Sequence, residues 1–281
     1  MSESITVASL QFSAGQDIAE NIERMGRWVA EAVAMEARWL VLPETWSLRV
    51  SADKHNYRYQ QSVAFEAQLK EQMAQWAKQH QVVLFGGSIY TQGESEGKLR
   101  NTSFVYSDQG KLVGEYSKLH LFDLPAAKRF ESEHVEAGSD LCVVEVDGWK
   151  VGLSICYDIR FPALFSKLRA YGAEVIVVPA AFTVPTGKAH WELLVRSRAV
   201  ESQCYFIAVD QWGASGPGTE CWGHSMTVDP WGDVCAQKER DDGIVLAELK
   251  KKKIETTRAR MPLQEHALSM KNRNFRSPVE S

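Results

Sequence analysis

The stretch of sequence that decides the fold is Gly152–Pro162, which reads GLSICYDIRFP. An apolar run ends at Cys156, and a tyrosine, an acid and, two residues later, a base follow. A strand that turns sharply into a helix presents its last side chain at the edge of the sheet, as nucleophile-bearing turns do. Free N–H groups at the start of that helix would favour a thiolate. Cys156 is therefore a candidate nucleophile, with a packed core thiol as the alternative.

Strand-like and helix-like runs alternate on both sides of this stretch. Apolar runs, several of them without polar alternation, predict strands at 5–12, 39–44, 82–90, 102–107, 150–156, 174–182, 205–212, 224–230 and 244–249. Helical periodicity predicts helices at 18–37, 64–80, 162–172 and 190–203. Turn residues predict two hairpins, at 101–117 and 228–237. This order predicts an α/β layered domain.

The composition of the 281 residues is that of an ordinary globular protein, with 44% hydrophobic and 24% charged residues. A net charge of -4 does not suggest a nucleic-acid partner. No apolar run approaches the roughly 20 residues that cross a bilayer, and the first residues lack the pattern of a signal peptide. We therefore expect a cytoplasmic protein without a membrane partner.

The chain has five cysteines, an odd number, and no two of them form a C-x-x-C pair. This argues against a disulfide framework and against a zinc ribbon. The histidines also lack the spacing of metal ligands. We therefore expect no metal site.

Two further polar residues stand at the ends of apolar runs. Glu44 follows a strand and a proline in VLPETW, and the carboxyl ends of strands are where ligands gather in α/β sheets. The alternative is a surface acid in a loop. Lys118 lies in GEYSKLHLFD, where burial would demand a counter-charge, and the alternative is a snorkelling lysine.

An acid, a cation and a thiol at three strand ends would together form a site for acyl transfer. The carboxylate of Glu44 would take the thiol proton, and the thiolate of Cys156 would attack a carbonyl. The ammonium of Lys118, with the backbone N–H of Tyr157, would stabilise the oxyanion.

These motifs resemble those of the nitrilase, or carbon–nitrogen hydrolase, superfamily over roughly residues 5 to 265. The family's Glu, Lys and Cys match Glu44 in VLPET, Lys118 in YSKLHLFD and Cys156 in GLSICYDIRFP. A further family glutamate, which orients the others, matches Glu131 in FESEHVEAG. The resemblance implies a cysteine amidase that acts on linear amides through a thioester and needs no cofactor.

The stretches AHWELLVRSRAVESQCY and WGHSMTVDPWG resemble the Nit branch, which includes ω-amidases and deaminated glutathione amidases. This implies a four-layer α-β-β-α sandwich with two central mixed sheets, and a homodimer. It also implies a small carboxylate-bearing amide as substrate, such as 2-oxoglutaramate or deaminated glutathione. We expect one hydrolase domain over residues 1–265, and a tail at 266–281 on the surface or at a dimer contact.

An acidic substrate needs a cation near the pocket mouth, for which Arg160, Lys188 and Arg129 are candidates. Arg160 could instead pair with local acids. Phe182 and Thr183, after the strand at 174–182, could line the pocket.

Two rival interpretations stay open. The first is an N-carbamoyl-amino-acid or other aliphatic amide hydrolase on the same scaffold. The second is a catalytically silent interaction protein, against which the intact set of Glu, Lys and Cys counts.

Overall fold

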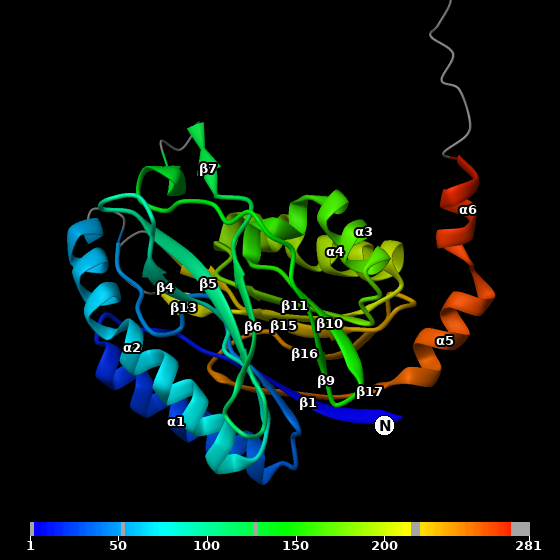
Figure 1. Ribbon diagram of the computed structural model, residues 1–281, viewed down its shortest axis with the longest axis horizontal. Coiled ribbons are helices and arrows are strands. Elements are labelled where there is room, and N and C mark those ends of the chain that lie inside the picture. The colour runs from blue at the N-terminus through cyan, green and yellow to red at the C-terminus, as the bar shows by residue number, and fades with distance from the viewer. Residues whose placement is uncertain (1–2, 52–53, 126–128, 215–219, 271–281) are drawn as a thin grey trace, which may run out of the picture.

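Two mixed sheets form the centre of the computed structural model (Figure 1), which describes residues 3–51, 54–125, 129–214 and 220–270, without the side chains of 129 and 267–270. The first sheet has the strand order β17 (Gly243–Lys250), β1 (Ser4–Gln11), β2 (Trp39–Val41), β3 (Val83–Phe85), β5 (Leu99–Tyr106) and β4 (Ile89–Gln92), and β6 (Leu112–Ser117) also pairs with β5. The second has the order β16 (Val234–Lys238), β15 (Ser225–Val228), β12 (Tyr205–Asp210), β11 (Val175–Ala180), β10 (Trp149–Leu153) and β9 (Val143–Val146). Each sheet has a parallel centre and antiparallel edges: β1, β2 and β3 are parallel, as are β10, β11 and β12.

Helices cover the outer face of each sheet, so the molecule has four layers. Helices α1 (Ile18–Ala34) and α2 (His55–His80) lie on one side, and α3 (Pro162–Ala170) and α4 (Val184–Ser202) lie on the other (Figure 1). The remaining described elements are short or peripheral: β7 (Asp123–Leu124), β8 (Arg129–Phe130), β13 (Trp212–Ala214), β14 (Glu220–Trp222), η3 (Glu131–Glu133), η4 (Cys156–Arg160), α5 (Lys251–Arg260) and α6 (Leu263–Met270). The expected α-β-β-α sandwich is confirmed.

The two faces of the first sheet bury different side chains, because residues alternate between the faces of a strand. Val7 belongs to a core shared with the second sheet, while its neighbour Ala8 belongs to the core under α1 and α2. In the shared core the Trp39 ring lies 6.2 Å from that of Trp149, which joins β2 to β10 across the sheets. The apolar strands of the sequence are thus covered on both faces.

The structure changes some predicted boundaries. The run at 82–90 forms two strands, and Gly87 between them has a φ of +59°. A side chain there would collide with the Pro43 carbonyl, so only glycine allows this close approach to the residue before Glu44. The antiparallel strand β9 was not predicted, and α2 begins nine residues before the predicted position 64.

The expected direct turn from strand to helix at Cys156 is wrong. Strand β10 ends at Leu153, a 3₁₀ turn holds Cys156–Arg160, and α3 begins only at Pro162. The proline fits the first turn of a helix because the N–H it lacks would have no partner there. The free amides of α3 therefore begin six residues after the thiol.

Near the C-terminal end of the described chain, α5 and the residue after it contact the residues that precede β11 and β12 of the second sheet. Arg258 donates to the Ala173 carbonyl at 2.9 Å, and Gln203 donates to the Met261 carbonyl at 2.6 Å. Helix α6 runs across the predicted boundary at residue 265. The division into a hydrolase domain and a tail stays a prediction, and residues 271–281 of that tail lie outside the described residues. None of the described helices has the length and apolarity needed to cross a membrane.

Candidate active site

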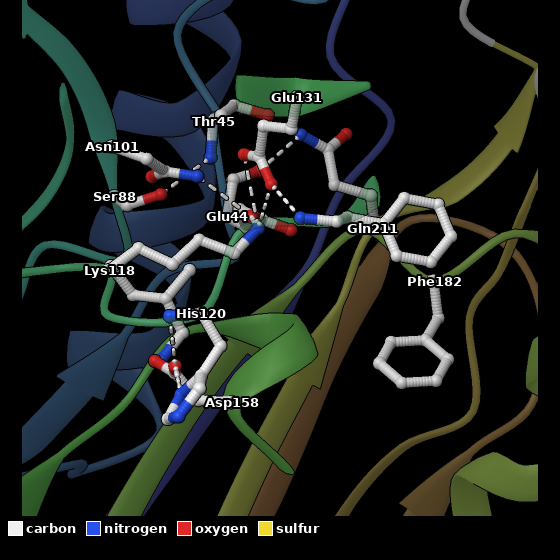
Figure 2. A network of polar contacts seen from close by, with 12 residues as sticks. Glu44, Thr45, Ser88, Asn101, Lys118, His120, Glu131, Asp158, Phe182 and Gln211 are labelled. Carbon is white, nitrogen blue, oxygen red and sulfur yellow. Dashed lines mark hydrogen bonds and ion pairs between the residues drawn. The ribbon is translucent and has the colours of Figure 1, made fainter. Parts of the chain in front are cut away.

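The structure brings Glu44, Lys118 and Cys156 together. Each follows a strand, respectively β2, β6 and β10, and all three are buried. Figure 2 shows the polar network around Glu44 and Lys118, whose members come from both sheets. The convergence that the sequence predicted is therefore present in the fold.

Lys118 lies between two carboxylates. Its Nζ is 3.1 Å from Glu44 Oε1 and 2.9 Å from Glu131 Oε2, and only 3% of its side chain is exposed. Burial alone would lower the pKa of Lys118, but the negative charges of Glu131 and Glu44 raise it well above its usual value. The ammonium is thus a fixed positive charge in a dry site.

Glu44 is held from three directions. Asn101 Nδ2 donates to Glu44 Oε1 at 2.8 Å, and Gln211 Nε2 donates to the Glu44 backbone carbonyl at 2.7 Å. The next amide, that of Thr45, donates to Ser88 Oγ at 3.1 Å. These bonds fix both the carboxylate and its backbone (Figure 2).

Glu131 opens the 3₁₀ turn η3, and its carboxylate accepts the Phe122 amide at 2.6 Å. Both oxygens of the Glu131 carboxylate also accept hydrogen bonds from Lys118 Nζ. Glu131 therefore anchors the lysine as a second carboxylate, in addition to Glu44.

Cys156 has a left-handed backbone, with a φ of +47°. This conformation costs about 1–3 kcal/mol for a residue other than glycine and persists only where the surroundings impose it. The Glu44 side chain and the Ala181 amide that follows β11 both act on the pKa of its thiol, so both lie near the sulfur. The strained turn thus places the sulfur beside the carboxylate.

The thiol of Cys156 is protonated at neutral pH. Burial raises its pKa well above the ordinary value, and the Glu44 carboxylate raises it further, whereas Lys118 and the Ala181 amide act in the opposite direction. The expectation that helix N–H groups favour a free thiolate is wrong, because α3 starts too late and burial dominates. A nucleophile in this state needs a base at the moment of attack.

The structure brings Tyr157, predicted to help hold the oxyanion, together with two of the predicted pocket residues, Arg160 and Phe182. The guanidinium of Arg160 lies over the rings of Tyr157 and Phe182, at 5.6 and 5.3 Å from their centroids, and contacts His190 Nδ1 at 3.3 Å. It makes no ion pair with the side chains that the structure describes, so the alternative of pairing with local acids is not seen. Thr183 precedes α4 without capping it through its side chain.

The other two cation candidates are not placed at the site. Lys188 is exposed and lines an open cleft of about 630 Å³ along the outer face of α4, together with Leu193 and Trp231. The side chain of Arg129 lies outside the described residues. Among the described residues no group of His, Cys, Asp and Glu gathers as a metal site.

The sequence did not predict the roles of three supporting residues. Asn101 and Gln211 hold Glu44, and both are almost fully buried. Gln211 directly follows strand β12, so the signal that singled out Glu44, a polar residue after an apolar strand, was present there also. The third is Asp158, which lies inside the 3₁₀ turn and accepts the Ile155 amide at 2.9 Å.

Fold and site together are those of a hydrolase: a four-layer α-β-β-α sandwich in which a paired carboxylate and ammonium lie near a buried thiol. The chain belongs to the carbon–nitrogen hydrolase family, whose model matches residues 6–259. This confirms the resemblance on which the sequence analysis relied.

Similar proteins cover nearly the whole chain. A deaminated glutathione amidase of Yersinia enterocolitica is 32% identical over 92% of this chain and 92% of its own. The omega-amidase NIT2 of Homo sapiens is 33% identical over 92% of this chain and 94% of its own. The crystal structure of the NitFhit protein of C. elegans superposes with a TM-score of 0.91 and 33% identity, over 99% of this chain and 69% of that one.

Proposed function

We propose that this chain is a cysteine amidase that hydrolyses a small amide bearing a carboxylate, such as 2-oxoglutaramate or deaminated glutathione. The observation that carries the proposal is the position of Lys118 between Glu44 and Glu131, with Glu44 near enough to the Cys156 thiol to raise its pKa. The names of the human and Yersinia relatives support the substrate class.

In the acylation step Glu44 accepts the thiol proton as Cys156 attacks the amide carbon. A C–S bond forms, and the carbonyl oxygen becomes an oxyanion that Lys118 Nζ and the Tyr157 amide stabilise. As the oxyanion collapses, the C–N bond breaks and the amine leaves with the proton that Glu44 carried. The product of this step is a thioester on Cys156.

In the deacylation step Glu44 takes a proton from a water molecule, whose oxygen attacks the thioester carbon. The C–S bond breaks, the sulfur recovers its proton from Glu44, and the carboxylic acid leaves. Glu131 does not touch the reacting atoms in this scheme. Its role is to keep the ammonium of Lys118 in place when the charge on Glu44 is neutralised.

Steady-state kinetics on 2-oxoglutaramate, deaminated glutathione and an N-carbamoyl amino acid test this proposal. We expect kcat/KM for one of the first two to exceed that for the carbamoyl compound by at least about 100-fold, or 2.7 kcal/mol. Faster hydrolysis of the carbamoyl compound would support the rival hydrolase. Absence of turnover on all three, with a folded protein, would support the silent interaction protein.

Arg160 is the group that we expect to bind the substrate carboxylate, since its guanidinium is partly exposed and has no carboxylate partner in the described structure. We expect Arg160→Met to raise KM for 2-oxoglutaramate about 10- to 100-fold, the loss of one charged hydrogen bond, with a smaller change in kcat. A neutral aliphatic amide is the control, and its KM should change less than about threefold. Equal losses on both substrates would show that Arg160 shapes the pocket rather than binding the carboxylate.

The homodimer and the cytoplasmic location remain proposals. Three apolar side chains are exposed along the cleft at α4: Leu193 by 66%, Val200 by 39% and Trp231 by 39%. Such an exposed apolar face suits a contact with a second copy of the chain. Light scattering of the purified protein tests the dimer, and cell fractionation tests the location.

A further inference from the structure

We propose that Asp158 is a positioning residue that joins the turn carrying Cys156 to the segment carrying Lys118, and that His120 completes this clamp. The inference rests on the proposed function in assuming that the sulfur and the ammonium must keep a fixed relation during the reaction. Figure 2 shows His120 and Asp158 next to each other, below the Lys118 network.

The carboxylate of Asp158 is fully buried and receives four hydrogen bonds. Its Oδ1 accepts from the His120 amide at 3.0 Å and faces His120 Nδ1 at 2.7 Å. Its Oδ2 accepts from the Tyr116 hydroxyl at 2.6 Å and from the Ile155 amide at 2.9 Å. Because a carboxylate only accepts, His120 carries a proton on Nδ1.

The four donors come from two segments, which is why the contact acts as a clamp. Tyr116 and His120 flank Lys118 on both sides in the chain, whereas Ile155 is the residue before Cys156. One carboxylate therefore joins the segment that carries the ammonium to the turn that carries the sulfur. The left-handed φ of Cys156 needs such a restraint, because an unrestrained turn would relax to a commoner conformation.

The ring of His120 is itself held in place. It stacks on Phe161 with centroids 3.7 Å apart and planes at 8°, and Phe161 follows the 3₁₀ turn directly. A second contact thus connects the segment of Lys118 with the turn of Cys156. None of these groups touches the thiol, so their effect on the reaction is through position.

Asp158→Asn is the direct test, because it keeps the shape of the side chain and removes half of its acceptors. In the wild type one carboxylate oxygen accepts the His120 backbone N–H and the other accepts the Ile155 backbone N–H. In either orientation of the asparagine amide, its NH₂ group would therefore face one of these N–H donors. We expect kcat to fall about 100-fold, the effect of a displacement of about 1 Å, with KM changed little. Unchanged kcat would overturn the proposal.

Two matched pairs of variants keep the proposal testable if Asp158→Asn does not fold. In His120→Asn, an NH₂ group takes the place of Nδ1–H, whereas His120→Ala has no donor. We expect the alanine variant to lose about 10-fold or more in kcat and the asparagine variant to recover most of it. Likewise Tyr116→Phe should lower kcat, and Tyr106→Phe, at a buried tyrosine away from Asp158, should not. Equal losses within both pairs would contradict the clamp.

A second measurement separates this inference from the proposed function. The rate at which iodoacetamide alkylates Cys156, followed by peptide mass mapping against pH, reports the pKa of the thiol without any amide substrate. Glu44 raises the pKa of the thiol, whereas Lys118 and the Ala181 amide lower it, so a sulfur that changes its position among these groups changes its pKa. In Asp158→Asn we therefore expect the midpoint to shift by about one pH unit, with the direction set by which of these groups the sulfur leaves. If this shift occurs in a protein that hydrolyses no amide, the clamp stands and the proposed function fails; an unchanged midpoint with full amidase activity would sink the clamp alone.

Discussion

Replacement of Cys156 with alanine is expected to lower kcat by about 10⁴-fold or more, because no other group near Glu44 and Lys118 can form the acyl-enzyme. Binding should survive, because the side chains that surround the substrate remain. The measurement is the release of ammonia or amine from the best substrate of the panel. Mass spectrometry of the intact protein gives a second measurement: a thioester adduct should be trapped on the wild-type chain at low pH and not on the variant.

Cys204→Ala is the matched control for this substitution. Cys204 is also a fully buried thiol, but its sulfur contacts the Ala173 carbonyl at 3.1 Å, far along the chain and away from Glu44. Loss of this thiol should affect stability more than turnover. If Cys156→Ala kept a tenth of the wild-type kcat, or if both variants lost activity equally, the thioester route would be wrong.

The proposed catalytic set was predictable from the sequence because of where its members stand. Glu44, Lys118 and Cys156 are polar residues that end apolar runs, and ligands gather at the carboxyl ends of strands in α/β folds. The α/β layering followed from strands that are apolar on both faces. Both predictions depend on features that a single chain displays locally.

The supporting contacts could not be predicted, because they depend on geometry that no local pattern encodes. The 3₁₀ turn at Cys156 replaces a helix start because Asp158 is bonded to Tyr116 and His120, about 40 residues earlier in the chain. The state of the thiol depends on burial by both sheets, which outweighs the nearby ammonium. The position of Arg160 likewise depends on Phe182, which lies in the connection between β11 and α4.

Glu44→Gln is expected to change two properties of Cys156 in opposite directions, its turnover of amide and its reactivity toward a Michael acceptor. Turnover should fall by about 10²- to 10⁴-fold, because the amide cannot accept the thiol proton or activate water. Addition of a Michael acceptor such as N-ethylmaleimide to Cys156 should instead become faster at neutral pH. The Glu44 carboxylate raises the pKa of the thiol and Lys118 lowers it, so removal of the negative charge lowers the pKa.

The sign of this shift is open to direct measurement. Below its pKa the thiolate fraction grows tenfold per pH unit, so the curve of addition rate against pH should move to lower pH in Glu44→Gln. Glu131→Gln is the control: it also removes a carboxylate bonded to Lys118, but Glu131 does not act on the thiol directly, and the curve should move less. An unchanged curve, or one moved to higher pH, would mean that Glu44 does not govern the thiol. The base in the proposed mechanism would then have to be a group other than Glu44.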